Sequence, residues 1–273
     1  MKILITILSV ILFSSCANSK ETNYTASTPA SALVRSFLGI SQTDSVDFIR
    51  WKLTLTDVKY SLECNYGIGK PNTNGFYDGG KKISFQGSTK RENNIYILQN
   101  NDLVLKFIEL NSNLLHILNE DNTLMIGGGG WSYALNNIAP TTNDQLKLAA
   151  TKTIIKDSMA FQGRTPCGVP GVLKSQQCYK LKWYLVLYGD PVKNEPLTYR
   201  VLGTGFRAEG GRRGKWVINK YTDGKIVYEL LDETEKPLFH LLKLDDGVLI
   251  FTDEKGDLLV GDHDFSYTLN RKF

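Results

Sequence analysis

A segment in the middle of the chain is repeated at its end, and this repeat constrains the fold more than any other feature. Leu124–Asn136 aligns without a gap to Leu258–Asn270, with six of thirteen positions identical. Upstream, the apolar run that contains Trp51 lies opposite the run that contains Trp183, in the same order along the chain. Such self-similarity at a long, nearly constant spacing indicates a duplicated structural unit.

The repeat also suggests where each copy begins. An aromatic-x-Gly pattern occurs at Phe37–Gly39 and again at Phe161–Gly163. We therefore predict two related domains separated by a linker. The predicted bounds are 33–138 for the first domain, 139–154 for the linker and 155–273 for the second domain.

Short runs of strand-favouring residues fill both copies. Ile49–Leu55 alternates apolar with polar or charged residues, which is typical of a strand with one buried face. Turn residues such as Asn72–Gly75 and Asp223–Gly224 separate these runs. Pairing of the last strand with the first would remove both edges of each sheet. The sequence thus predicts an all-β chain of two tandem antiparallel small barrels, each filled by side chains or holding one small ligand.

The first residues have the pattern of an export signal. A basic start precedes the apolar run Ile3–Phe13, which is shorter than the ~20 residues that a membrane-spanning helix needs. Small residues then precede Cys16, and this segment resembles the lipobox of bacterial lipoproteins. We expect a signal peptide over 1–15, a lipid on Cys16 and a flexible polar tether over 16–32. The alternative is an ordinary secretory signal with an unmodified cysteine.

The lipid would make the membrane a partner of this protein. We expect an outer-membrane, lipid-anchored protein that faces the periplasm or the cell surface. The formal net charge of +4 is small for 273 residues, and the basic residues are scattered. A nucleic-acid binder needs a concentrated basic face, so no nucleic-acid partner is expected.

The start of the second copy carries a more specific motif. Phe161–Cys167 is followed closely by Pro170–Val172, and Gly214–Trp216 comes later. Together these segments resemble the aromatic-x-Gly-x-x-Pro-Cys opening and the Gly-x-Trp motif of the NlpE-like envelope lipoproteins. The resemblance implies a lipocalin-related antiparallel barrel linked to copper homeostasis and envelope stress. It implies a non-enzymatic binding, interaction or stress-sensing module with an envelope protein as partner.

This chain departs from the family at one cysteine. The family has a Cys-x-x-Cys pair, but Gly168-Val169 stands between Cys167 and Pro170 here. A copper or redox site of the Cys-x-x-Cys type is therefore not supported residue by residue.

The remaining cysteines are Cys64, Cys167 and Cys178. An oxidising envelope favours disulfides, and Cys167 and Cys178 flank a loop that contains Gly and Pro, so they are the expected pair. Cys64 is then left over. It is interpreted as a buried small hydrophobe, with a reactive or metal-binding thiol as the alternative.

The histidines lack close metal-ligand spacing. Copper or zinc would use thiol and imidazole ligands, and the weak candidates are Cys64, Cys167 and His263. His263 lies between two aspartates on an expected loop, where a solvated histidine is the alternative. His116 lies in an apolar run and is expected to be a strand residue that faces outward. Metal binding stays open, and no cofactor is expected.

No pattern of an enzyme active site is present. The chain has no Gly-x-Ser-x-Gly elbow, and Gly127–Gly130 lacks the lysine and helix of a P-loop. Ser45 and Ser158 each follow an aspartate, in tripeptides that resemble O-glycosylation acceptors of some bacterial envelopes. We therefore expect no enzyme. The alternative function is a lipocalin-like carrier of a small apolar ligand.

Overall fold

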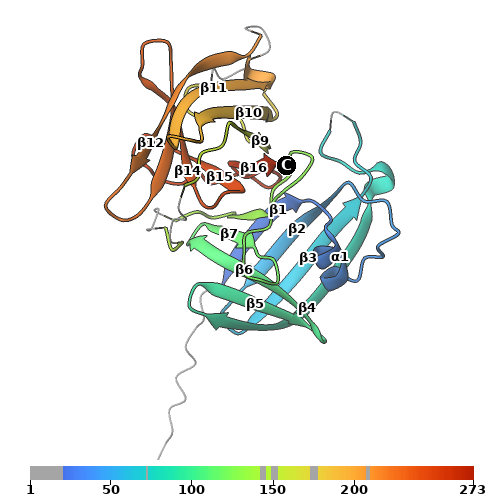
Figure 1. The fold of residues 1–273 in the computed structure, drawn as a ribbon. Helices are drawn as coiled ribbons and strands as arrows, with labels where there is room; N and C mark the ends of the chain where they lie inside the picture. The colour runs from blue at the N-terminus through green and yellow to red at the C-terminus, as the bar shows by residue number, and fades with distance from the viewer. Residues whose placement is uncertain (1–20, 72, 142–145, 149–152, 173–177, 207–209) are drawn as a thin grey trace, which may run out of the picture.

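Two closed antiparallel barrels of eight strands each make up the protein (Figure 1). The computed structural model describes residues 21–71, 73–141, 146–148, 153–172, 178–206 and 210–273. Every strand pair in both barrels is antiparallel. The predicted all-β fold with two tandem barrels is confirmed.

The first barrel closes through the pairing of its first and last strands, β1 and β8. Its strands are β1 (Thr22–Thr28), β2 (Phe48–Leu55), β3 (Lys59–Gly67), β4 (Lys81–Glu92), β5 (Ile95–Asn100), β6 (Leu103–Asn111), β7 (Leu114–Ile117) and β8 (Ala134–Asn137). The helix α1 (Ala32–Leu38) connects β1 to β2, and the 3-10 turn η1 (Tyr77–Gly79) lies between β3 and β4.

The second barrel repeats this plan and closes through β9 and β16. Its strands are β9 (Ser158–Thr165), β10 (Leu181–Asp190), β11 (Glu195–Gly203), β12 (Arg212–Lys220), β13 (Ile226–Leu231), β14 (Pro237–Lys243), β15 (Val248–Thr252) and β16 (Thr268–Lys272). A 3-10 turn, η2 (Thr204–Phe206), follows β11. All of these elements lie inside the predicted bounds 155–273.

The first barrel begins earlier than the sequence predicted. Thr22–Thr28 forms β1, although the tether was expected to extend to residue 32 and the domain to start at 33. The proposed match of Phe37 with Phe161 is also wrong, because Phe37 lies in α1 and Phe161 lies in β9. The true counterpart of β9 is β1.

The strand registers establish that counterpart. Ala26 of β1 lies opposite Trp51, as Gly163 of β9 lies opposite Trp183. Both tryptophans then make the same buried bond. Trp51 Nε1 donates to Thr28 Oγ1 at 2.8 Å, and Trp183 Nε1 donates to Thr165 Oγ1 at 2.9 Å.

Aromatic side chains fill the interiors of both barrels. In the first barrel, Trp51 meets Phe107 with ring centroids 6.3 Å apart. In the second, Trp183 lies 5.5 Å from Phe239 and 4.8 Å from Phe251. Rings at these distances are in edge or tilted contact, so side chains occupy the space where they meet, as in other small barrels.

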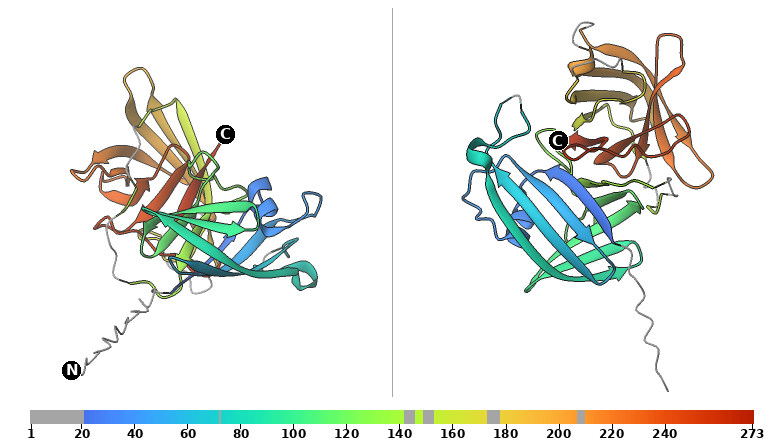
Figure 2. Two further views of the ribbon diagram at one scale, coloured as in Figure 1. Left: turned by 90° about the horizontal axis from the view of Figure 1, so that it is seen from below. Right: turned by 180° about the vertical axis from the view of Figure 1, so that it is seen from behind.

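The two barrels pack wall against wall. Leu114 and Leu118 of the first barrel belong to the same apolar cluster as Leu242 and Ile250 of the second. Every residue of β7 and of β15 is buried, because one face of each strand lines its own barrel and the other meets the neighbouring barrel. Figures 1 and 2 show β6 and β7 (green) beside β14 and β15 (orange-red).

Candidate functional site

The cysteines pair as expected. Cys167 and Cys178 form a disulfide with their Cα atoms 6.0 Å apart. The sulfur of Cys167 is therefore not a thiolate, and Cys167 is withdrawn as a metal ligand in this oxidised state. The expected lipidation site Cys16 lies outside the described residues.

Cys64 is a buried free thiol of the first barrel. Its side chain is 3% exposed and belongs to the apolar cluster of that barrel with Leu62 and Tyr66. Burial raises the pKa of the thiol, which disfavours the thiolate that binds metals or attacks electrophiles. These properties fit the buried small hydrophobe that was expected.

His263 lies exposed in the loop before β16. Among the described residues, no group of three or more His, Cys, Asp or Glu side chains is arranged to hold a metal ion. Ser45 and Ser158, the predicted O-glycosylation sites, are both exposed. Their modification stays a prediction.

His116 faces outward from the first barrel yet is completely buried. It shares a strand face with Leu114 and Leu118, which pack against the second barrel. His116 Nε2 lies 2.9 Å from the carbonyl oxygen of Met125, whereas Nδ1 has no partner among the described residues. Burial lowers the pKa of His116 to about 4.

The repeated aromatic-Ser-Tyr segments meet each other across the barrel interface. Ser132 and Ser266 hydroxyls lie 2.6 Å apart. Asn136 Oδ1 accepts from the Gly261 amide at 2.9 Å, and Asn270 Oδ1 accepts from the Gly127 amide at 2.8 Å. The two copies are therefore related by a pseudo-two-fold arrangement in which each asparagine binds the other copy's loop.

A buried aromatic stack continues this interface. Trp131 stacks on Phe265 of the second barrel at 5.3 Å and on Phe48 at 4.4 Å, and Phe48 stacks on Phe76 at 4.3 Å. The repeat in the sequence had revealed Trp131 and Phe265 as equivalent residues, but it did not indicate that they touch.

Asp264 provides the main charged contact between the barrels. Its Oδ1 accepts from Arg50 Nε at 2.9 Å and from Ser27 Oγ at 3.4 Å, and its Oδ2 accepts from Asn74 Nδ2 at 2.7 Å. Ser27 and Arg50 face each other on β1 and β2. No signal in the sequence indicated the role of this carboxylate, because its partners lie more than 180 residues away along the chain.

A cleft of about 460 Å³ lies between the barrels, and Phe48 and Trp131 of the aromatic stack line it. Its lining is rich in cations and aromatic rings: Asp47, Phe48, Lys70, Trp131, Arg164, Lys180 and Lys182, with Gly128 and Gly129. The Arg164 guanidinium lies 4.6 Å from the centre of the Trp131 ring. Four basic side chains line this cleft, Lys70, Arg164, Lys180 and Lys182, and Asp47 is the one acid among the described lining residues.

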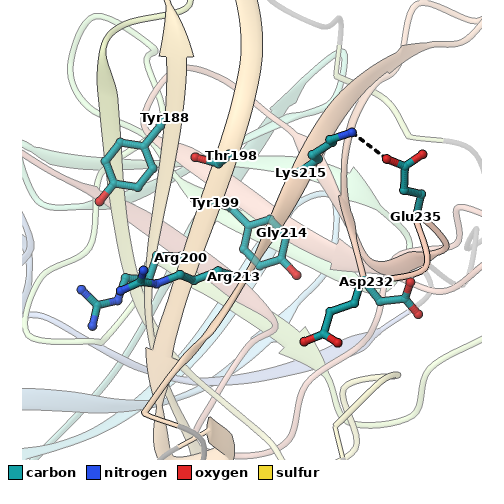
Figure 3. Close-up of a pocket in the computed structure, with 10 residues that line it drawn as sticks. Tyr188, Thr198, Tyr199, Arg200, Arg213, Gly214, Lys215, Asp232 and Glu235 are labelled. Carbon is teal, nitrogen blue, oxygen red and sulfur yellow. Dashed lines mark hydrogen bonds and ion pairs between the residues drawn. The ribbon is translucent and has the colours of Figure 1, made fainter.

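A larger hollow, of about 740 Å³, lies on the second barrel beside β11 and β12 (Figure 3). Here the charges are balanced. Lys215 Nζ donates to Glu235 at 2.6 Å, and the Asp232 carboxylate accepts from Thr234, which lowers the pKa of Asp232. Burial raises the pKa of Tyr199 to about 12. Lys215 and Glu235 are thus held in an ion pair, and Asp232 is held in a turn.

No protein-family model, curated protein or solved structure matches the chain. The resemblance to NlpE-like lipoproteins therefore stays a prediction. In the described part of the chain, no helix has the length and apolar character needed to cross a membrane.

Proposed function

We propose that this protein is a membrane-anchored envelope lipoprotein that acts as a non-enzymatic binding or stress-sensing module. One observation carries the binding role: two barrels with ring-filled interiors are joined wall to wall, with a basic cleft at the seam. The filled interiors favour this role over the lipocalin-like carrier of an apolar ligand. The binding surfaces would then lie outside the barrels.

The anchor would hold the first barrel close to the membrane. Five residues lie between Cys16 and Thr22, the first residue of β1, which makes six residue-to-residue steps. An extended chain spans at most about 3.6 Å per residue, so β1 would start within about 20 Å of an acylated Cys16. A module held this close could contact other components of the outer membrane.

The anchor is tested by expressing the full chain and a Cys16→Ala variant in a Gram-negative host. We expect intact-mass spectrometry to show cleavage before Cys16 and added acyl chains, with the protein in the outer-membrane fraction. The Cys16→Ala chain should lack the acyl mass. Unmodified Cys16 in a soluble secreted chain would contradict the lipoprotein proposal.

A copper-related role is suggested by the family resemblance, but the described residues offer few side chains that could bind copper. With Cys167 in a disulfide, Cys64 is the free thiol of the described residues, and it is buried. Native mass spectrometry with Cu(I) separates the possibilities. Binding to the oxidised chain that Cys64→Ser abolishes would support a copper role, and absence of binding would leave a partner-sensing module.

A further inference from the structure

The basic cleft contains two like charges directly opposite each other. Arg164 of β9 pairs in register with Lys182 of β10. Both lie on the outer face of the second barrel, because Thr165 and Trp183 beside them point inward. Like charges in directly opposite positions destabilise a sheet. Within the described residues, no ion pair or side-chain hydrogen bond joins either side chain to an acid.

Lys180 adds a third cation. Burial, followed by the charges of Arg164 and Lys182, lowers the pKa of Lys180, and Asp264 opposes this change. However, Asp264 is already bound by Arg50 and Asn74. The carboxylate that lines the cleft, Asp47, accepts from the Gly69 amide at 2.8 Å.

The half of the interface that is pseudo-symmetric to this cleft has a carboxylate in the equivalent place. There, the cross-strand pair Ser27–Arg50 faces the carboxylate of Asp264. The counterparts are Arg164 for Ser27 and Lys182 for Arg50, as the registers of the two tryptophans establish. The counterpart of Asp264 in the aligned repeat is Gly130, which has no side chain.

Gly130 does occupy the equivalent place. A Cβ atom at this position would lie only 2.9 Å from Arg164 Cγ, and the φ of Gly130 is +85°. The glycine therefore leaves room for the arginine, whose guanidinium is then held against Trp131. One half of the interface has the cation Arg50 and a built-in carboxylate, and the other has the cross-strand cations Arg164 and Lys182 with no carboxylate in that position. Lys180 lies close to both halves, because its pKa responds to Arg164 and Lys182 while its Nζ donates to Asn74 Oδ1 at 3.3 Å.

We propose that an external phosphate group takes the place of this carboxylate, bound between Arg164, Lys180 and Lys182 in the inter-barrel cleft. A guanidinium matches the geometry of phosphate oxygens, and lysines neutralise the second charge. Three cations suit a doubly charged phosphate better than a single carboxylate. The phosphate could be free or carried on a lipid headgroup. This inference rests on the proposed binding role and specifies its ligand chemistry.

The test measures phosphate binding to the full chain in a nonionic detergent by calorimetry and thermal unfolding, at constant ionic strength. Inorganic phosphate is expected to raise the unfolding midpoint by a few degrees, because a ligand that binds the native state stabilises it. Arg164→Ser, which copies the other half of the interface, and Lys182→Gln should each weaken binding about tenfold or more, since 1.4 kcal/mol corresponds to tenfold.

Three controls make the result decisive. Lys193→Gln removes an exposed lysine from the hairpin at the far end of β10 and should bind like the parent. Arg164→Lys keeps the charge and should bind more weakly than the parent but more tightly than Arg164→Ser. Without phosphate, Lys182→Gln should unfold at an equal or higher temperature than the parent, because it relieves repulsion.

The source of the phosphate is separated by a second titration with dihexanoyl phosphatidic acid. An affinity at least about tenfold higher than that of inorganic phosphate assigns a lipid headgroup, and equal affinity assigns the free ion. No phosphate-dependent shift in the parent, or the same shift in Lys182→Gln and Lys193→Gln, overturns the site. The titrations do not depend on acylation, so failure of the anchor proposal is seen separately in the mass of Cys16.

Discussion

The two barrels share their strand plan but fill their ends differently. In the first, α1 inserts Phe37 among Tyr60 and Phe85. In the second, the segment after β9 is tied by the Cys167–Cys178 disulfide, and Phe206 of η2 packs on Trp183. The duplicated framework is thus the strands and their shared interface. The connections at the ends are where the copies have become different modules.

The largest expected effect comes from removing either end-filling ring. Phe37 and Phe206 are both buried, and replacing a buried phenylalanine by alanine costs about 3–5 kcal/mol. We expect Phe37→Ala to speed hydrogen exchange in β1–β8 and Phe206→Ala to speed it in β9–β16. Faster exchange across both barrels in either variant would show that the interface makes them one cooperative unit.

Acid should act on the copies unequally through His116. Its counterpart at an offset of 134 residues is Ile250, and each lies opposite an equivalent residue, Ala134 or Thr268. The pKa of His116 is lowered to about 4 in the folded protein, mainly by burial. The unfolded chain therefore binds the proton more readily than the folded one, so stability falls as pH drops from about 6.5 to about 4.

The resulting loss of unfolding free energy at low pH is on the order of 3 kcal/mol, since each pKa unit corresponds to about 1.4 kcal/mol. His116→Ile, which copies the second barrel, should remove that part of the pH dependence. Denaturant unfolding at pH 7, 6 and 5 measures it. Parallel pH curves for the parent and His116→Ile would contradict the assignment.

The disulfide should stabilise only the second barrel's end. It closes a loop with a sequence separation of 11, for which the chain-entropy model gives about 3 kcal/mol. We expect the double variant Cys167→Ala/Cys178→Ala to lower the free energy of unfolding by up to that amount. Amide hydrogen exchange should become faster near β9 and η2. A reducing agent should have the same effect on the parent and none on the double variant. Equal loosening around α1 would contradict this localisation.

The sequence predicted the parts that are governed by local pattern. The strand around Trp51 follows from alternation, and the two repeats that end at Asn136 and Asn270 follow from spacing. The Cys167–Cys178 pair follows from the position of the two cysteines around one loop. β1 was missed because Thr22–Thr28 is rich in Thr and Ser, as a tether is. Its polar outer face is buried because residues of the second barrel, including Asp264, cover it.

The interface between the barrels could not be predicted from the sequence. Leu114–Ile117 was recognisable as a strand, and His116 as outward-facing, but only packing of the second barrel makes that face buried. Likewise, Gly130 and Asp264 align in the repeat. Asp264 forms an ion pair with Arg50, whereas Gly130 only leaves room for Arg164. Both contacts join segments that are far apart in the sequence.

The interface asparagines offer the finest comparison, because the same residue makes unequal bonds in the two copies. Asn136 Nδ2 donates to carbonyl oxygens of Asp262 at 3.0 Å and Phe265 at 3.2 Å. Asn270 Nδ2 reaches the Trp131 carbonyl only at 3.5 Å, near the limit of a hydrogen bond. Asn136 therefore contributes more to the interface than Asn270.

Asn270→Ala leaves the buried Gly127 amide without its acceptor, and Asn136→Ala leaves the half-buried Gly261 amide without one, for a loss of about 1–3 kcal/mol. We expect Asn136→Ala to lie near the upper end of that range and Asn270→Ala near the lower end, as measured by denaturant unfolding. The double variant tests whether the two halves act together. If the two losses of unfolding free energy add, the two asparagines act independently. If the loss in the double variant is well below their sum, removal of one asparagine already separates the barrels.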